Sequence, residues 1–351
     1  MPPEKAPEDA EPGDLSGVPR PREQFRLVGH EGAEAAFAEA IGSGRLHHAW
    51  LIGGPRGIGK ATLAYRVARR LLARSGSAHP GLDVDPADPA VRKVAVLSHP
   101  NLVVLRRHRG PGVKAMPTRI GVDAARGALD LFGSTAGNDG HRICIVDSAD
   151  DLNANSANAL LKMIEEPPER SLFLVVSHAP GRLLPTIRSR CRALHLRPLS
   201  EAQVAEVVSG FPAPFPRPDA SALARAAAQA EGSVARAVAL LDPPTAALVA
   251  EVEALLAGIE RPDWRRILKL AERLAGRDSE ALLEAGLDTV FRFVSAELDR
   301  RRHEPPARLA ALVEVCEKFA RAAREAATYN LDRRPLVLSL FGDLAGAVRA
   351  A

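Results

Sequence analysis

The fold is decided by one stretch of the sequence, which reads Leu51-Ile52-Gly53-Gly54-Pro55-Arg56-Gly57-Ile58-Gly59-Lys60-Ala61-Thr62. An apolar run leads into a glycine-rich turn and a lysine, and a helical pattern then continues from Leu63 to Leu72. Gly54, Gly59 and Lys60 match the phosphate-binding pattern G-x-x-x-x-G-K-[ST]. The glycines let successive backbone N–H groups point at phosphate oxygens, and the dipole of the following helix favours the same negative charge. The stretch therefore predicts a P-loop between a strand and a helix.

The residue after the lysine departs from this pattern. Ala61 occupies the position of the Ser or Thr whose hydroxyl normally holds Mg²⁺. Thr62 follows one residue later, and a shift of about 100° around a helix should aim its hydroxyl elsewhere. We therefore expect a degenerate site that requires no cofactor and binds ATP or ADP at most weakly. From this loop, the predicted site takes Gly54, Gly57, Gly59, Lys60 and Thr62.

A second element, Ile143-Cys144-Ile145-Val146-Asp147, is an apolar strand that ends in a carboxylate. Such a carboxylate lies at the carboxyl edge of the sheet, where open α/β sheets bind ligands. In P-loop ATPases of the AAA+ class the next residue is a glutamate that polarises water. Here it is Ser148, which is no general base by itself. Together with Ala61 this indicates a site that has lost hydrolysis, although Asp147 as a mere cap of the next segment is an alternative.

The stretch before the last predicted strand is the part that most resembles a known family. Ser189-Arg190-Cys191 resembles the Ser-Arg-Cys motif of DNA polymerase clamp loader subunits, which are AAA+ proteins. The phrase from Asn158 to Pro168 is similar to the helix before the fourth strand in that family. The resemblance implies that Arg190 is an arginine finger, supplied in trans to the ATP site of a neighbouring subunit. The alternative is a surface arginine, since Arg188 and Arg192 show that arginine is common here.

The resemblance extends to the remaining parts of a nucleotide site. Ser177, after the predicted fourth strand, would sense the terminal phosphate. Arg236, in Gly232-Ser233-Val234-Ala235-Arg236, would be a second sensor that reaches back towards a nucleotide, with a solvated helical arginine as the alternative. Leu27-Val28-Gly29-His30 would line an adenine pocket.

The alternation of apolar runs with helical patterns predicts an α/β P-loop (AAA+) domain with a parallel sheet buried on both faces. Its strand candidates are Ala49–Ile52, Leu102–Leu105, Ile143–Val146, Leu172–Val176 and Ala193–Leu196. After Pro198 the pattern is helical, which predicts a lid and then an all-α collar, implied by the resemblance to be an oligomerisation domain. The predicted order is a disordered tail (1–21), the AAA+ domain (22–199), the helical lid (200–241) and the C-terminal collar (245–351), with an irregular insertion at 76–96.

The composition argues against several other classes. Hydrophobic residues make up 46% of the chain and the net charge is +4, which is ordinary for a globular protein and does not indicate a dedicated nucleic-acid binder. The three cysteines, Cys144, Cys191 and Cys316, have no metal-ligand spacing, so we expect neither zinc nor disulfides. No apolar run reaches the length of a membrane span and the N-terminus lacks an apolar signal core, which favours the cytoplasm.

A degraded phosphate loop combined with a retained finger resembles the delta-prime class of the clamp loader family. The resemblance implies a subunit that helps ATP-driven loading of the sliding clamp onto primed DNA. Its partners would be motor and delta subunits in a heteropentameric ring, with the clamp and primed DNA reached through the complex and no membrane involved. Three alternatives are an ATP-hydrolysing motor subunit or other AAA+ ATPase, a motor for branched DNA, and a nucleotide-binding scaffold outside replication.

Overall fold

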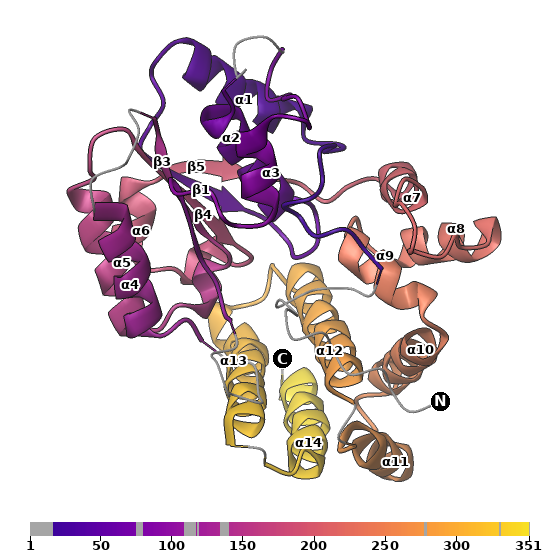
Figure 1. The fold of residues 1–351 in the computed structure, drawn as a ribbon. Helices are drawn as coiled ribbons and strands as arrows, with labels where there is room; N and C mark the ends of the chain where they lie inside the picture. Colours follow the sequence, from indigo (N-terminus) through magenta and orange to yellow (C-terminus); the bar gives the residue numbers. More distant parts are fainter. Residues whose placement is uncertain are drawn as a thin grey trace. The chain divides into compact units, whose positions relative to one another are not determined.

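The five apolar runs expected as strands form one parallel sheet in the computed structural model (Figure 1). The strands are β1 (Ala49–Gly53), β2 (Leu102–Leu105), β3 (Arg142–Val146), β4 (Ser171–Ser177) and β5 (Arg192–His195). Their order is β2-β3-β4-β1-β5, and every neighbouring pair is parallel. The structure describes residues 17–74, 80–108, 117, 119–133, 140–276, 279–329 and 331–350. The chain divides into two compact units between Val238 and Ala239, and the sheet belongs to the first.

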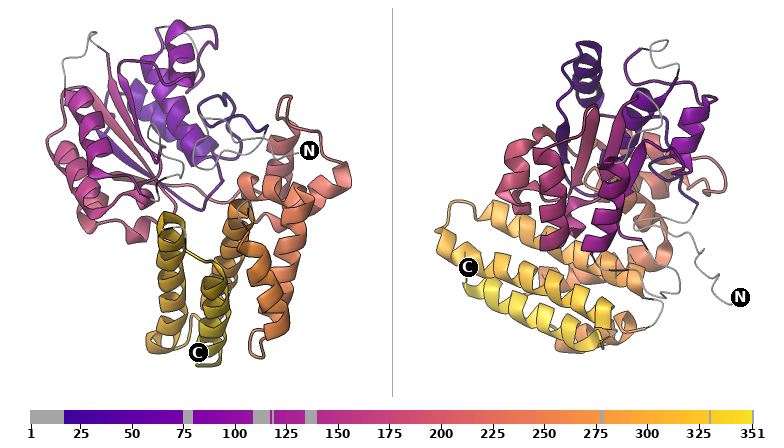
Figure 2. Two further views of the ribbon diagram at one scale, coloured as in Figure 1. Left: turned by 60° about the horizontal axis from the view of Figure 1, so that its bottom comes forward. Right: turned by 60° about the vertical axis from the view of Figure 1, so that its left-hand side comes forward.

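Helices cover both faces of this sheet, because successive side chains along a strand point to opposite sides. Trp50 and Ile52 of β1 belong to one core cluster, whereas Ala49 and Leu51 belong to the other. The helices on the first face are α1 (Glu31–Gly42), α2 (Lys60–Leu72) and α3 (Pro89–Ala95), and those on the second are α4 (Val122–Gly133), α5 (Ala154–Glu165) and α6 (Pro185–Arg190) (Figure 1; Figure 2). The short 3-10 helices η1 (Ala149–Asp151) and η2 (Pro180–Arg182) follow β3 and β4. This is the predicted α/β architecture.

Two local details differ from the sequence prediction. β5 is not buried on both faces, since Arg192, Ala193 and His195 are exposed, as an edge strand with a single strand neighbour allows. The predicted irregular insertion is wrong for residues 89–95, which form α3. Asp88 caps this helix by accepting the Ala90 N–H, and a proline fits its first position because no backbone donor is needed there. Residues 76–79 of the predicted insertion lie outside the described residues.

The lid segment, residues 200–241, forms three helices, as its pattern predicted. They are α7 (Glu201–Ser209), α8 (Ala220–Gln229) and α9 (Val234–Leu241). Ser200 and Gln203 cap α7 reciprocally, and the Asp219 side chain caps α8. The division between the two compact units falls inside α9, so the assignment of three separate domains stays a prediction.

The second unit, as far as the structure describes it, is built of helices around one apolar core. These are α10 (Pro243–Ala257), α11 (Trp264–Leu274), α12 (Glu280–Arg300), α13 (Pro306–Tyr329) and α14 (Arg334–Ala350). Leu248, Leu312 and Phe341 lie in the centre of the core and are almost fully buried. Asp242 caps α10 and two prolines form its first positions, so this Asp-Pro-Pro sequence starts a helix. Among the described residues, no helix combines the length and apolarity that a membrane span requires.

Candidate functional site

The phosphate loop joins β1 to α2, and its backbone angles explain the glycines. Gly57 has φ +76° and Gly59 has φ +101°, both in the region that favours glycine. A Cβ atom on Gly57 would lie 2.3 Å from Ser233 Oγ and 2.7 Å from Ala235 Cβ. The Val234 N–H donates to the Gly57 carbonyl at 2.9 Å. The start of α9 therefore packs directly on the loop, and only glycine leaves it room.

Lys60 turns its ammonium back onto the phosphate loop. The side chain is buried, and Nζ donates to the Gly54 carbonyl at 2.7 Å and also to the Pro55 carbonyl. Burial lowers the pKa of Lys60 to about 8, although the charges of Asp147 and Asp150 oppose the shift. The Lys60 ammonium is thus held by carbonyl groups of the phosphate loop itself.

A cavity of about 260 Å³ lies at the carboxyl ends of β1, β3 and β4, where open α/β sheets bind ligands. Its wall includes the predicted site residues Gly57, Gly59, Lys60, Thr62 and Asp147. Thr62 lines the cavity beside Ala61, although the one-residue shift was expected to turn it away. Gly54, Ser177 and Arg236 are not part of the described wall.

The acidic side of the cavity follows β3. Burial raises the pKa of Asp147, and the Lys60 ammonium opposes this shift. Ser148 is buried, and it lines the cavity together with Asp151, whose carboxylate pairs with Arg107 at 3.0 Å. The residue in the position of the catalytic glutamate is therefore a buried serine, which carries no carboxylate.

Ser177 lies at the end of β4, as predicted, but its hydroxyl is already hydrogen-bonded. Its Oγ donates to Asp150 Oδ1 at 3.1 Å, and the same carboxylate accepts the backbone N–H groups of His178 and Ala179 at 2.7 and 3.0 Å. His178 lines the cavity, where desolvation and then the positive charge of Lys60 lower its pKa. Sequence reasoning missed Asp150 and His178; the position of His178 two residues after a predicted strand was the available signal.

The segment before α1 also forms part of the cavity wall. Val18, Pro19 and Pro21 line it, so residues 17–21 of the predicted tail have a defined place, while residues 1–16 lie outside the described residues. The buried Arg69 of α2 donates to the carbonyls of Arg22, at 2.9 Å, and Gln24. These bonds attach the segment to α2.

The predicted adenine pocket lies partly on this cavity. Leu27 and Val28 line it, whereas His30 is buried and its Nε2 lies 2.6 Å from the Ile58 carbonyl. His30 therefore contacts the backbone of the phosphate loop and does not line the cavity.

Arg236 of α9 does not line the cavity, and its side chain is hydrogen-bonded to the end of α8. Its Nε donates to the Gln229 carbonyl at 2.8 Å, and its backbone N–H bonds Ser233 Oγ at 3.2 Å. The role of a second sensor stays a prediction, and this contact would have to break before Arg236 could reach a nucleotide.

Arg190 lies at the exposed end of α6, apart from the residues of the cavity wall. Its Nη2 pairs with Glu165 Oε1 at 2.9 Å, and its Nη1 donates to the Thr186 carbonyl at 3.1 Å. The neighbouring arginines differ, since Arg188 donates to the Gly181 carbonyl and Arg192 stacks over Trp50. Arg190 is thus the member of this group that combines exposure with a carboxylate partner.

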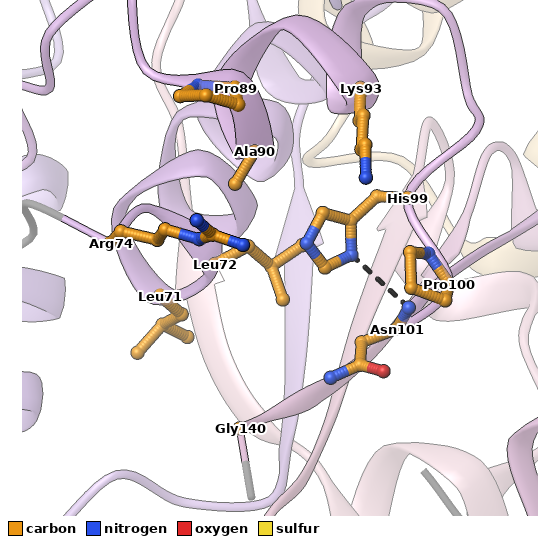
Figure 3. A pocket seen from close by; sticks show the side chains of 10 residues that line it. All are labelled: Leu71, Leu72, Arg74, Pro89, Ala90, Lys93, His99, Pro100, Asn101 and Gly140. Atoms are coloured by element: carbon orange, nitrogen blue, oxygen red, sulfur yellow. Dashed lines mark hydrogen bonds between the residues drawn. The ribbon is translucent and has the colours of Figure 1, made fainter. Parts of the chain in front are cut away.

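A second cavity, of about 140 Å³, lies at the opposite edge of the sheet, where β2 and β3 begin. Its wall holds Arg74, Lys93 and His99, and His99 Nδ1 accepts the Asn101 N–H at 3.1 Å (Figure 3). It contains none of the predicted site residues. In the part of the chain that the structure describes, no three His, Cys, Asp or Glu side chains are grouped as metal ligands.

Comparison with known proteins places this site in a family context. The family model described as "DNA polymerase III, delta subunit" matches residues 29–200. The chain is 35% identical over 158 residues to DNA polymerase III subunit delta' of Pseudomonas aeruginosa. The aligned region covers 45% of this chain and 45% of that protein. It is 30% identical over 227 residues to subunit tau/gamma of Haemophilus influenzae, covering 64% of this chain and 31% of that protein. The chain thus spans less than half the length of either relative.

Among the solved structures that the chain matches is the DNA polymerase III gamma subunit-related protein of Thermotoga maritima. It is 13% identical, with a TM-score of 0.40, and the match covers 90% of this chain and 98% of that one.

Proposed function

Because this chain is a member of the clamp loader family of DNA polymerase III subunits, we propose that it acts as a delta-prime subunit. In this role it joins motor and delta subunits in a ring of five, and it helps the ATP-driven loading of a sliding clamp onto primed DNA. It contributes Arg190 to the ATP site of a neighbour and hydrolyses no ATP itself.

One observation carries the second half of this proposal: the phosphate loop keeps its shape while two groups needed for hydrolysis are absent. Ala61 has no side-chain oxygen for Mg²⁺, and Ser148 replaces the glutamate that would polarise water. Lys60 is retained and lies against the phosphate loop, where its ammonium can bind an anion. The site therefore suits passive, weak binding of ATP or ADP.

The proposed role of Arg190 rests on its exposure and its chemistry. A guanidinium offers a planar fork of donors and keeps its charge at any physiological pH, which suits it to the charge that develops on a transferring phosphoryl group. An arginine supplied in trans to such a site is worth about 10³–10⁵ in rate. Arg188 and Arg192 differ from Arg190 in their partners, which are the Gly181 carbonyl and the Trp50 ring, whereas Arg190 pairs with a carboxylate.

The experiment is reconstitution of the loader from the tagged full chain with motor and delta subunits, the sliding clamp, primed DNA and ATP. The chain should copurify in a fixed ratio and be required for clamp loading. Arg190→Ala should remove much of the turnover at one neighbouring site, by up to about 10³-fold there, whereas Arg188→Ala and Arg192→Ala should do much less. Equal effects of the three substitutions, or an Arg190→Ala effect that comes only from lost assembly, would show that the finger assignment is wrong.

A second candidate is an ATP-hydrolysing motor subunit, which the similarity to a tau/gamma subunit favours. It requires that another group replaces the missing hydroxyl and glutamate. Phosphate release by the isolated chain separates the two candidates.

A further inference from the structure

The side chain of Arg190 is held by groups of its own chain before any neighbour is present. Its Nη2 lies 2.9 Å from Glu165 Oε1, and its Nη1 donates to the Thr186 carbonyl at 3.1 Å. The Ser189 hydroxyl lies 3.4 Å from Nη1 and itself donates to the Thr186 carbonyl at 3.1 Å. These contacts select one side-chain conformation among the many open to an exposed arginine.

The backbones that carry both charged groups are fixed by the core. Ile164, directly before Glu165, is buried in the cluster between the sheet and α4 to α6, and its carbonyl lies 3.1 Å from His48 Nε2. Ile187 of α6 is buried in the same cluster. The separation of Glu165 and Arg190 is therefore set by packing, and their contact needs little further ordering of the backbone.

The carboxylate leaves the guanidinium able to bind another group. An arginine has five N–H donors, and the contacts of Arg190 involve Nη1 and Nη2. Nε has no partner among the described residues, so at least this donor and part of the Nη2 amino group remain for a phosphate oxygen. A partner that consumed the whole fork would block the finger, and Glu165 does not.

From this geometry we infer that Glu165 is a positioning residue for Arg190, which holds the guanidinium ready for the phosphate of a neighbouring subunit. The inference rests on the proposed function, because it needs Arg190 to act in trans. Both side chains are partly open to solvent, at 41% and 39% exposed, so the pair holds the arginine only modestly. We expect loss of the carboxylate to cost about two- to fivefold in turnover, far less than loss of Arg190 itself.

The test uses the reconstituted loader with Glu165→Ala, Glu165→Gln, Arg190→Ala and the double variant Glu165→Ala/Arg190→Ala. The ATP turnover that Arg190→Ala removes is the turnover that depends on Arg190. The loss in each Glu165 variant is expressed as a fraction of this turnover. Glu165→Ala should lower kcat of this turnover about two- to fivefold with KM for ATP unchanged. Glu165→Gln should restore most of the rate, because its amide oxygen can still accept the Nη2 hydrogen bond. The double variant should match Arg190→Ala.

The matched control is Glu166→Ala, since Glu166 is an exposed neighbouring carboxylate without an ion pair to a described residue. It should leave turnover unchanged, and thermal unfolding of each isolated variant should stay close to that of the unaltered chain. Unchanged turnover in Glu165→Ala, or an equal loss when Arg190 is already alanine, would overturn the positioning role while leaving the finger intact. Unchanged turnover in Arg190→Ala would instead overturn the proposed function.

Discussion

The hydroxyl of Ser177 donates a hydrogen bond to Asp150, with 3.1 Å between Oγ and Oδ1. The same carboxylate caps the backbone N–H groups of the two residues after β4. In a nucleotide site, the group at the end of this strand would face the terminal phosphate, but here it is bonded to an acid of its own chain. Asp150 thus joins η1 to the end of β4, and the bonds that it accepts stabilise the turn.

Asp150→Ala should therefore destabilise the first unit. Three hydrogen bonds to Asp150 are lost at once, and of their donors the Ala179 N–H keeps Ser177 Oγ as an acceptor, whereas the hydroxyl of the fully buried Ser177 and the His178 N–H lose theirs. Leaving buried donors unsatisfied costs about 1–3 kcal/mol of unfolding free energy. Urea unfolding of the full chain measures the change. Glu169→Ala, which removes an exposed carboxylate of the same unit, is the control and should shift stability by less than about 0.5 kcal/mol. Equal stability of the two variants would contradict the role of Asp150.

Gly57→Ala should disturb the junction between the phosphate loop and α9. The added Cβ would meet Ser233 Oγ at 2.3 Å, and the positive φ disfavours alanine. Gly44→Ala is the matched control, because Gly44 has φ +68° but no atom within 4 Å of an added Cβ. The difference between the two variants, expected to be roughly 1–3 kcal/mol, isolates the steric clash. Hydrogen exchange at the Val234 amide should speed up only in Gly57→Ala. Equal exchange in both variants would contradict the predicted clash between the phosphate loop and α9.

Nucleotide binding should weaken as pH rises from 7 to 9. With a pKa of about 8, Lys60 is mostly protonated at pH 7 and mostly neutral at pH 9, and phosphate oxygens prefer the ammonium. If only the protonated form binds, the affinity for ADP falls about tenfold over this range. A bound phosphate stabilises the protonated form of Lys60, so the pKa of Lys60 in the complex lies above its pKa in the free chain. Calorimetry at the two pH values checks this, and Lys60→Met should bind weakly at both.

The isolated chain should release no phosphate from ATP above background, because Ala61 cannot ligate Mg²⁺ and Ser148 is no general base. Steady-state phosphate release, measured with and without primed DNA and clamp, is the test. Lys60→Ala is the control for contaminating ATPases. Turnover that disappears in Lys60→Ala would mean that this site hydrolyses ATP after all.

The purified chain should contain no stoichiometric zinc. A structural zinc site needs about four Cys or His ligands in tetrahedral arrangement, and the three cysteines lie far apart in the sequence. Elemental analysis after dialysis, without chelator, measures the metal content. One zinc per chain would refute the prediction.

Local patterns in the sequence were sufficient for the architecture and for most of the loop. The predicted strand Leu102–Leu105 coincides with β2, and the ends of the other strands differ by at most one residue. Such agreement follows because a buried parallel strand needs a run of branched apolar residues, and this need is visible without tertiary contacts. The P-loop was equally visible, since positive φ at Gly57 and Gly59 restricts these positions to glycine.

Only the tertiary structure decided which partners the polar side chains take. Nothing near Asp150 in the sequence indicates that it bonds Ser177, 27 residues away, and nothing near Glu165 indicates Arg190. Residues 17–21 were expected to be disordered from their composition, yet Val18 and Pro19 line the cavity. Secondary structure follows from backbone sterics and the periodic burial of apolar groups, which are properties of short segments. A hydrogen bond or an ion pair forms only if side chains of remote segments lie at the right distance to within a few tenths of an ångström. Packing sets that distance.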